Sequence, residues 1–417
     1  MTPAQTEDVV IVGAGIVGIA CAAMLAEAGR RVLVIDRTGI CAETSSGNAA
    51  ALAFTDILPL AQKGMLRQVP RWLLDPLGPL AIPPTYLPRL TPWLWRFWRA
   101  GAPKHRRRSV DVQAALMRLA EAEWMALIDR AGARSMLRED GSLELYESEA
   151  EFSRSLPGWA ERERHGIPFE HVARARLAEL QPGLSPRFVR GTFAPGWKTV
   201  SDPQLFGRAV WAYAEQRGAR FEQSLVRGIE PGRGGGATCL VLEGGRAVEA
   251  GTLVIAAGAW SHRLTRRLGD RVPLETERGY NTTLPPGAFD VKRQLIFSGH
   301  GFVVTPLETG LRIGGAVELG GIERPPSWAR ARAMLKKTES FLPGLKAEGG
   351  REWMGFRPSL PDSLPVIGKS RSPGVFYAFG HGHLGLTQAA ASARLIRDLV
   401  LGHKPALDLS PFSAQRF

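Results

Sequence analysis

Apolar residues recur along this chain with the periods of both strands and helices, and the first 36 residues show both. Runs at residues 9–12 and 32–35 have the length of short buried strands, and the stretch from Ile16 to Ala28 between them is long and apolar. Gly29 follows that stretch, where glycine commonly ends a helix. Two strands joined by a helix make a parallel βαβ unit. We therefore expect the chain to open a doubly wound α/β sheet.

A similar pattern returns near residue 200. Asp202 is a good helix N-cap, Pro203 suits the first turn and Gly218 suits the stop, so we expect a helix over residues 203–217. Further α/β elements are expected as strands at residues 219–229, 252–256 and 376–379, a glycine-rich hairpin at residues 234–236, and a last helix at residues 386–401.

Between these segments the pattern is one of short strands and polar turns. It covers about 150 residues after the first unit, including residues 142–146, and returns at residues 273–317, where 295–306 and 310–317 predict a hairpin. The chain therefore predicts two interleaved lobes. The expected α/β lobe comprises residues 1–75, 201–265 and 346–417, and the expected α+β lobe, built on an antiparallel sheet, comprises residues 76–200 and 266–345.

A glycine-rich turn joins the first strand to the first helix. Gly13, Gly15 and Gly18 have the GxGxxG spacing, which permits a tight turn, close approach of the backbone to a pyrophosphate, and close packing of helix on strand. Asp36 lies 23 residues after Gly13, at the end of the second strand, where a carboxylate can accept hydrogen bonds from ribose hydroxyls. Because Asp36 would repel a 2′-phosphate, the motif predicts FAD or NAD rather than NADP.

Three further segments favour FAD. Residues 43–50, ETSSGNAA, offer small polar groups and backbone donors that can surround the pyrophosphate and ribityl chain of a flavin, and residues 254–261, VIAAGAWS, let the backbone approach the same cofactor. Residues 380–385, GHGHLG, precede the last helix, whose N-terminus would stabilise negative charge on a reduced flavin. Since no cysteine or acidic cluster accompanies His381 and His383, we expect no metal.

The residues expected to contact the cofactor come from these segments and from a strand near residue 226. They are Gly13, Gly15, Ile16, Val17, Gly18, Asp36, Arg37, Ser45, Ser46, Asn48, Ala49, Val226, Ala257, Gly258, Trp260, Gly380, Gly382, His383, Leu384, Gly385 and Thr387.

Taken in order, VVIVGAGIVG, ETSSGNAA, VIAAGAWS, GFRPSLPDSLPVIG and GHGHLGLT resemble the FAD-dependent D-amino-acid oxidase and dehydrogenase superfamily, nearest to the D-amino-acid dehydrogenases. The resemblance extends from residue 9 to about residue 400. It implies a discontinuous FAD-binding Rossmann-like α/β domain interleaved with an α+β substrate domain built on an antiparallel sheet. It also implies non-covalent FAD and oxidation of an amino acid by hydride transfer from the α-carbon to flavin N5. No residue is assigned as acid or base.

Within this resemblance Arg357 takes the place of a ligand for the substrate carboxylate, and a guanidinium fork suits that task because it holds both oxygens. The alternative for Arg357 is a structural ion pair with Asp362. Tyr280 is a candidate second carboxylate or lid contact, or else an exposed strand tyrosine, with Arg278 as a further candidate. His383 matches a position that faces substrate but departs from the arginine found there.

The substrate and the electron acceptor stay open at this point. The segment ERGYNTTLP at residues 277–285 resembles members that act on D-proline or D-hydroxyproline. A glycine or sarcosine oxidase that uses oxygen is an alternative, and a tRNA-modifying flavoprotein is an alternative of another class. The acceptor is oxygen or a quinone. Because the sequence shows no RNA-handling module, we expect no nucleic-acid partner.

The composition of residues 76–110 differs from that of the rest of the chain. The 417 residues are 44% hydrophobic and carry a formal charge of +13. No acidic residue occurs over residues 76–110, whereas arginines and tryptophans are frequent there. Thr91 as cap, Pro92 in the first turn and Gly101 as stop predict a short helix. Residues 91–108 therefore predict either an anionic membrane-docking segment or a helix packed in the substrate lobe.

The cysteine content and the N-terminal sequence indicate where in the cell the protein is located. Only three cysteines occur, and the N-terminus has no basic stretch before its first apolar run, so we expect neither a disulfide framework nor a signal peptide. No apolar stretch is long enough to span a bilayer. We expect a cytoplasmic protein, or one peripheral to the inner face of the membrane.

Overall fold

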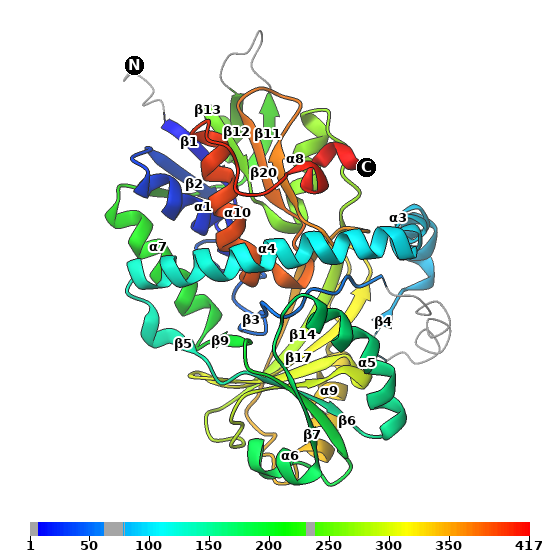
Figure 1. Cartoon of the computed structure of the whole chain (residues 1–417). Coiled ribbons are helices and arrows are strands. Elements are labelled where there is room, and N and C mark those ends of the chain that lie inside the picture. The colour runs from blue at the N-terminus through cyan, green and yellow to red at the C-terminus, as the bar shows by residue number, and fades with distance from the viewer. Residues whose placement is uncertain (1–6, 62–77, 79, 231–237) are drawn as a thin grey trace.

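The computed structural model describes residues 7–61, 78, 80–230 and 238–417. Two sheets lie at opposite ends of the molecule, and the long helix α4 (Pro103–Arg130) crosses between them (Figure 1). The predicted hairpin at residues 234–236 and the predicted domain boundary between residues 75 and 76 lie outside the described residues.

The first sheet begins with the predicted βαβ unit, β1 (Glu7–Val12), α1 (Ile16–Glu27) and β2 (Val32–Asp36). β1 lies in parallel between β2 and β13 (Ala247–Ile255), and β2 pairs in parallel with β10 (Arg220–Gln223). The remaining strands of this sheet are β11 (Val226–Glu230), β12 (Thr238–Leu242), β19 (Val366–Lys369) and β20 (Val375–Phe379). The mostly parallel order confirms the predicted doubly wound sheet.

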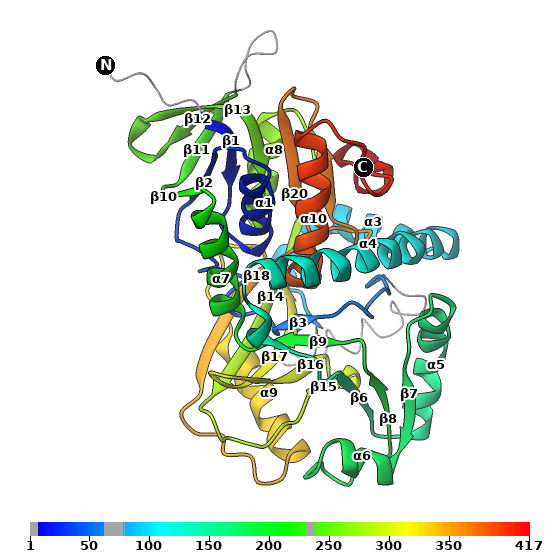
Figure 2. The ribbon, with the colours of Figure 1, turned by 60° about the vertical axis from the view of Figure 1, so that its left-hand side comes forward.

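Helices cover one face of this sheet because their own faces are apolar. Nearly all of α1 is buried, and it packs against α7 (Pro203–Gln216) and α10 (Gly385–Val400) (Figure 2). The Asp202 side chain accepts hydrogen bonds from the backbone N–H groups of Gln204 and Leu205, which confirms it as the N-cap of α7. These helices and the adjoining strands enclose the largest apolar core of the described residues.

The second sheet is mainly antiparallel, as predicted, with one parallel pair in its main path, between β6 and β15. Its order is β18 (Arg351–Ser359), β14 (Glu275–Leu284), β17 (Gly310–Leu319), β16 (Phe302–Leu307), β15 (Gln294–Phe297), β6 (Ser142–Tyr146), β8 (Arg190–Ala194) and β7 (Glu170–Ala173), with β4 (Leu80–Ala81) beside β17. A small third sheet contains β3 (Ala51–Leu52), β9 (Lys198–Val200) and β5 (Leu137–Arg138). The remaining helices are α3 (Leu87–Ala100), α5 (Glu149–Arg164), α6 (Arg174–Leu180), α8 (Ser261–Arg267) and α9 (Trp328–Phe341).

The predicted hairpin is confirmed between β16 and β17. Its first strand is shorter than residues 295–306, because a turn at Ser298–His300, followed by Gly301 with φ of 67°, divides these residues into β15 and β16. The predicted helix cap is wrong. Thr91 does not cap a helix, because α3 begins at Leu87 and the Thr91 hydroxyl donates to the Leu87 carbonyl. Gly101 does follow the last residue of α3, as predicted.

The interval expected to hold strands and turns contains long helices. α4 packs its buried residues, including Leu116, Trp124 and Leu127, into the core beside α10. The Trp124 indole also donates to the Leu386 carbonyl at 2.9 Å. Conversely, β18 lies in the antiparallel sheet although the predicted bounds place residues 346–417 in the α/β lobe. The chain thus crosses between the lobes more often than the predicted domain bounds allow.

Candidate functional site

A cavity of about 1430 Å³ lies between the two main sheets. Its walls combine the turn after β1, the segment after β2, the start of α10 and the facing strands of the antiparallel sheet. Almost all of the residues predicted to contact the cofactor line this cavity, together with Arg357, Tyr280 and His383. Gly18, Ser46 and Gly380 do not line it.

The three fingerprint glycines are fixed by backbone contacts. Gly13 has φ of 114°, and a Cβ there would lie 2.4 Å from the Ala256 carbonyl oxygen. A Cβ on Gly18 would lie 1.9 Å from the Gly13 carbonyl oxygen, so Gly18 serves helix packing rather than the cavity wall. Gly15 lines the cavity and is the N-cap of α1, whose first turn holds no acidic side chain. The turn therefore presents a helix N-terminus that suits a phosphate group.

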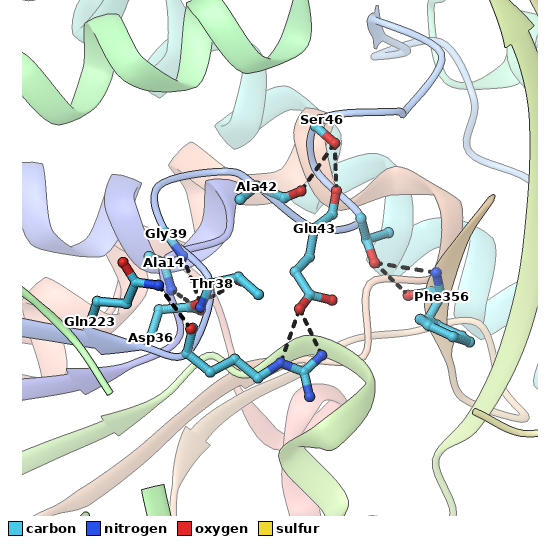
Figure 3. A network of polar contacts seen from close by, with 11 residues as sticks. Ala14, Asp36, Thr38, Gly39, Ala42, Glu43, Ser46, Gln223 and Phe356 are labelled. Atoms are coloured by element: carbon cyan, nitrogen blue, oxygen red, sulfur yellow. Dashed lines mark hydrogen bonds and ion pairs between the residues drawn. The ribbon is translucent and has the colours of Figure 1, made fainter. Parts of the chain in front are cut away.

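Asp36 organises the backbone at the end of β2 (Figure 3). Its Oδ2 accepts from the Ala14 N–H at 2.8 Å, and its Oδ1 accepts from the N–H and hydroxyl of Thr38 at 2.8 and 2.9 Å. Asp36 also lines the cavity. These contacts hold the carboxylate rigidly where the motif expects a ribose.

The segment after β2 contacts two aromatic residues from elsewhere in the chain, Trp260 and Phe356. The Arg37 guanidinium donates twice to one Glu43 oxygen and stacks 3.8 Å above the Trp260 ring. The Thr44 hydroxyl donates to the Phe356 carbonyl and accepts from the Phe356 N–H. Figure 3 shows Glu43 and Phe356 in this network. The Ser46 hydroxyl is used internally, since it donates to the Glu43 carbonyl at 2.8 Å.

Side chains of the antiparallel sheet hold the following residues, 46–49, from the other side. Arg312 donates to the carbonyls of Ser46 and Asn48, Asn281 donates to the Gly47 carbonyl, and Gln294 donates to the Ala49 carbonyl. Burial lowers the pKa of Arg312 to about 10, so it stays charged at neutral pH. A Cβ on Gly47 would lie 2.3 Å from the Trp353 ring. The sequence motifs did not identify these sheet residues as supports of the loop.

The start of α10 closes the far side of the cavity. Gly382, Leu384, Gly385 and Thr387 line it, and the first turn of α10 contains no acidic residue. Buried His381 lies beside them, and burial lowers its pKa to about 3. The Ser392 hydroxyl donates to the Gln388 carbonyl and so accepts from His381 Nε2 at 2.8 Å. His381 is therefore neutral and fixed by α10.

This arrangement fits FAD. Two helix N-termini, those of α1 and α10, open on one elongated cavity, and glycines stand where side chains would obstruct the backbone. A helix N-terminus carries partial positive charge, which suits the pyrophosphate at one end and the electron-rich ring of a reduced flavin at the other.

Arg357 lies in the wall of the same cavity without an acidic partner. Among the described residues it forms no ion pair, and it donates to the carbonyls of Ala316 at 2.9 Å and Gly315 at 3.3 Å. Burial lowers its pKa, an effect that the negative charge of Glu277 partly offsets. The alternative ion pair with Asp362 is wrong, because Asp362 binds Arg416 at 2.7 Å. The guanidinium lies over Gly279, where a Cβ would be 2.3 Å away.

The side chains of Tyr280 and Arg278 both bind Glu318. The Tyr280 hydroxyl donates to Glu318 and accepts from the Ser327 N–H at 3.1 Å, and Glu318 also pairs with Arg278 at 3.3 Å. Tyr280 is buried rather than an exposed strand residue. Its hydroxyl hydrogen is therefore not available to a substrate carboxylate, although the residue lines the cavity. Arg278 is buried and outside the cavity lining.

His383 lies at the cavity in a charged group that the sequence did not reveal. Its Nε2 is 3.3 Å from Asp56, which also pairs with Arg162 at 3.3 Å. The Arg162 guanidinium donates to the Thr55 carbonyl as well. Despite burial, the neighbouring His383 and Arg162 leave the pKa of Asp56 below its usual value.

Comparison with known proteins follows from this geometry. A family model described as FAD dependent oxidoreductase matches residues 8–399. The chain belongs to this family of FAD-dependent oxidoreductases. Its cofactor is FAD, as the sequence predicted.

Curated relatives of this flavoprotein span its whole length. A D-amino-acid oxidase of Bradyrhizobium diazoefficiens is 34% identical over 99% of both chains. A D-amino acid dehydrogenase of Sinorhizobium medicae is 31% identical over 98% of this chain and 99% of its own. These relatives confirm the predicted superfamily.

Solved structures of lower identity share the fold of this oxidoreductase. Glycine oxidase from Geobacillus kaustophilus superposes with a TM-score of 0.76 at 23% identity, covering 99% of each chain. L-proline dehydrogenase from P. horikoshii gives a TM-score of 0.76 at 19% identity, covering 99% of this chain and 98% of its own. Both confirm the predicted fold class.

The described residues of the flavoprotein include neither a metal-binding cluster nor a membrane-spanning helix. Among those residues no group of three or more His, Cys, Asp or Glu side chains could hold a metal ion. No helix described in the structure is long and apolar enough to cross a membrane.

Proposed function

We propose that this flavoprotein catalyses the oxidative deamination of a D-amino acid. The observation that carries the proposal is Arg357, a cavity guanidinium with carbonyl partners but no ion pair among the described residues. A half-buried cation in a cavity wall is stabilised by a counter-charge, and a substrate carboxylate supplies one in bidentate geometry. The names of the two curated relatives support a D-amino acid as the owner of that carboxylate.

The proposed reaction needs orientation more than acid–base catalysis. Arg357 would fix the carboxylate, so that the α-carbon and its neutral amine take one position in the cavity. FAD, when bound, accepts the hydride from the α-carbon. The resulting imine then reacts with water to give a 2-oxo acid and ammonia. The predicted cofactor residues that line the cavity, from Gly13 to Thr387, would hold FAD. The predicted interleaved lobes would form the two sides of the cavity.

The finer choice of substrate is a separate question. D-proline and D-hydroxyproline were suggested by residues 277–285, but in β14 the polar groups of Arg278 and Tyr280 are engaged with Glu318. Glycine or sarcosine is the alternative, which the glycine oxidase fold does not decide. The test is anaerobic mixing of purified holoenzyme with a panel of D- and L-amino acids, glycine, sarcosine and D-proline. We expect D-amino acids to bleach the flavin absorbance. Bleaching by glycine or sarcosine alone would replace the proposal by the alternative.

We also propose that α3 docks on an anionic membrane surface, where a quinone acceptor would be within reach. One face of α3 packs through buried Leu90 and Trp93, while Trp95 and Trp98 are 54% and 57% exposed. Arg96 and Arg99 lie exposed between and beside them. Exposed indoles flanked by cations suit the interface of an anionic bilayer. Oxygen remains the alternative acceptor.

A further inference from the structure

The cavity contains a carboxylate that the proposed chemistry does not use. Glu144, on β6, lines the cavity and accepts a hydrogen bond from the Ser298 hydroxyl at 2.6 Å. Among the described residues Glu144 forms no ion pair. Burial raises the pKa of its carboxyl group, which is the expected result for a half-buried carboxylate without a cation in contact.

Arg162 and His383, two basic residues of the cavity near Glu144, have Asp56 as their partner. Arg162 donates to Asp56 and to the Thr55 carbonyl, and His383 is the other partner of Asp56. Arg162 acts on Glu144 only through its longer-range positive charge. Arg106, half-buried, and Arg154, exposed, also line the cavity, and neither forms an ion pair with Glu144. Glu144 is therefore a cavity carboxylate with no cation in contact. Glu277 also lines the cavity without an ion pair among the described residues, but it lies opposite Arg357 in the register of β14 and β18 and acts on that guanidinium through its charge.

The sheet register relates Glu144 to Arg357. Ile296 on β15 pairs with Glu144 and with Val303 on β16, and Val303 pairs with Gly314 on β17, next to the Gly315 carbonyl that Arg357 contacts. Three strand spacings of about 4.8 Å separate the two ends of this row, so the backbone of Glu144 lies roughly 14 Å from that of Gly314, the neighbour of the carbonyl that Arg357 contacts.

The wall between these two ends is apolar. Ile296 and Val303 line the cavity there, and Gly314 contributes no side chain. A ligand that fits the row has a carboxylate at one end, an unbranched hydrocarbon stem in the middle and a cation at the other end. Basic amino acids have this form, because they carry a flexible aliphatic stem below a charged head.

We propose that Glu144 is a specificity-determining residue that binds the cationic side-chain end of a basic D-amino acid, while Arg357 binds its α-carboxylate. This rests on the proposed oxidative deamination and adds its substrate class, that of D-arginine, D-lysine and D-ornithine. Ser298 is a positioning residue, since its hydroxyl orients the Glu144 carboxylate. Short neutral side chains leave the Glu144 end of the row unfilled.

The experiment compares substrates of similar length and different charge. In wild-type holoenzyme, kcat/KM is measured for D-lysine and D-arginine against D-norleucine, with D-proline included. We expect Glu144→Gln to lower kcat/KM for the basic substrates by about 10- to 100-fold, the loss typical of a charge-assisted contact, and to change D-norleucine by less than about twofold. Glu149→Gln is the matched control, because Glu149 lies on the surface in an exposed pair with Arg190. It should leave both values unchanged.

Glu144→Asp is a second variant in case the amide disturbs β6. It keeps the charge but withdraws it, so it should shift preference from D-ornithine toward the longer D-arginine. An unchanged ratio of basic to neutral substrates in Glu144→Gln would overturn the proposal, and so would a wild type that prefers D-proline or D-norleucine to D-lysine. If no D-amino acid of either kind reduces the wild-type flavin, the proposed function itself fails.

Discussion

The two ends of the central cavity differ in the groups that line them: backbone groups at one end and charged side chains at the other. At the dinucleotide end, the turn after β1 depends on the absence of side chains at Gly13 and Gly18, and on backbone N–H groups that Asp36 orders. At the proposed substrate end, the wall presents the charged side chains of Arg357 and Glu144 from strands of the second sheet. The proposed cofactor end is therefore defined by backbone geometry, and the proposed substrate end by the position of individual charges.

This difference determines how each end should respond to mutation. A backbone turn has no substitute for a missing glycine, so changes there should affect FAD content and folding together. A charged side chain on a strand can be replaced without moving the backbone, so changes there should alter substrate kinetics while FAD content stays constant. The following tests are arranged from the largest expected effect to the smallest.

The largest effect is expected at the fingerprint turn. Gly13→Ala forces a Cβ into the Ala256 carbonyl at a φ of 114°, which should cost on the order of 3 kcal/mol and abolish FAD retention. Flavin absorbance of the purified protein measures this directly. Gly29→Ala is the control, since Gly29 has φ of 79° but no atom within 4 Å of the added Cβ, and it should cost only about 1 kcal/mol. Equal loss of FAD in both variants would contradict the contrast.

The next effect concerns Arg357. Arg357→Lys should reduce kcat/KM for amino acids by roughly 10- to 150-fold, because a single ammonium cannot reproduce the bidentate contact worth about 1.5–3 kcal/mol. Arg357→Ala should lose more. Both should keep wild-type FAD content, measured by the ratio of flavin to protein absorbance. If instead FAD is lost while the remaining holoenzyme keeps its amino-acid dependence, Arg357 is structural.

A smaller effect is expected on the pH dependence of stability, through His381. Its pKa falls from 6.5 to about 3 on burial, so the folded protein binds fewer protons than the unfolded chain between these pH values. Stability should therefore fall as pH drops below 6.5, by up to about 1.4 kcal/mol per pH unit. His381→Gln should make the fall of Tm with decreasing pH less steep, when Tm is measured from pH 7 to pH 4 with excess FAD. Parallel Tm curves for the two proteins would show that His381 is not the group responsible.

The smallest effect is expected outside the cavity. Replacing exposed Trp95 and Trp98 by serine should weaken binding to anionic vesicles by about tenfold and leave anaerobic flavin reduction unchanged. Leu205→Ser is the control, because Leu205 is an exposed apolar residue on α7, a different surface helix. Co-sedimentation with vesicles of phosphatidylglycerol and of phosphatidylcholine gives the readout. Equal binding of wild-type protein to both kinds of vesicle argues against docking.

The sequence predicted the backbone-defined end better than the charge-defined end, for a physical reason. The strand, glycine turn and helix at residues 9–28 encode their own geometry locally, and the Asp202 cap did the same for α7. Arg357 was identified through a family motif, but its partners were not, because Gly315 and Ala316 lie across the sheet from it. The alternative ion pair with Asp362 rested on closeness in the sequence rather than on strand register.

Some signals were present and were not recognised. The buried positions 110, 113, 117, 120, 124 and 127 of α4 recur every three or four residues, which is the pattern of a helix, within a segment expected to hold strands. Glu144 stood in a correctly predicted strand, but only the order of β6, β15, β16 and β17 shows which charge it faces. Long-range strand order is not encoded in any short segment, so this part of the site required the structure.

The central claim is that the α-carbon of a D-amino acid loses a hydride while Arg357 holds its carboxylate. The most direct measurement is anaerobic rapid mixing of holoenzyme with the D- and L-enantiomers of one amino acid, each with hydrogen or deuterium at the α-carbon. The account predicts flavin bleaching with the D-enantiomer, slower with deuterium, and a loss of that reaction in FAD-matched Arg357→Ala. A flavin that stays oxidised with every D-amino acid, or that is reduced equally by both enantiomers, would contradict it.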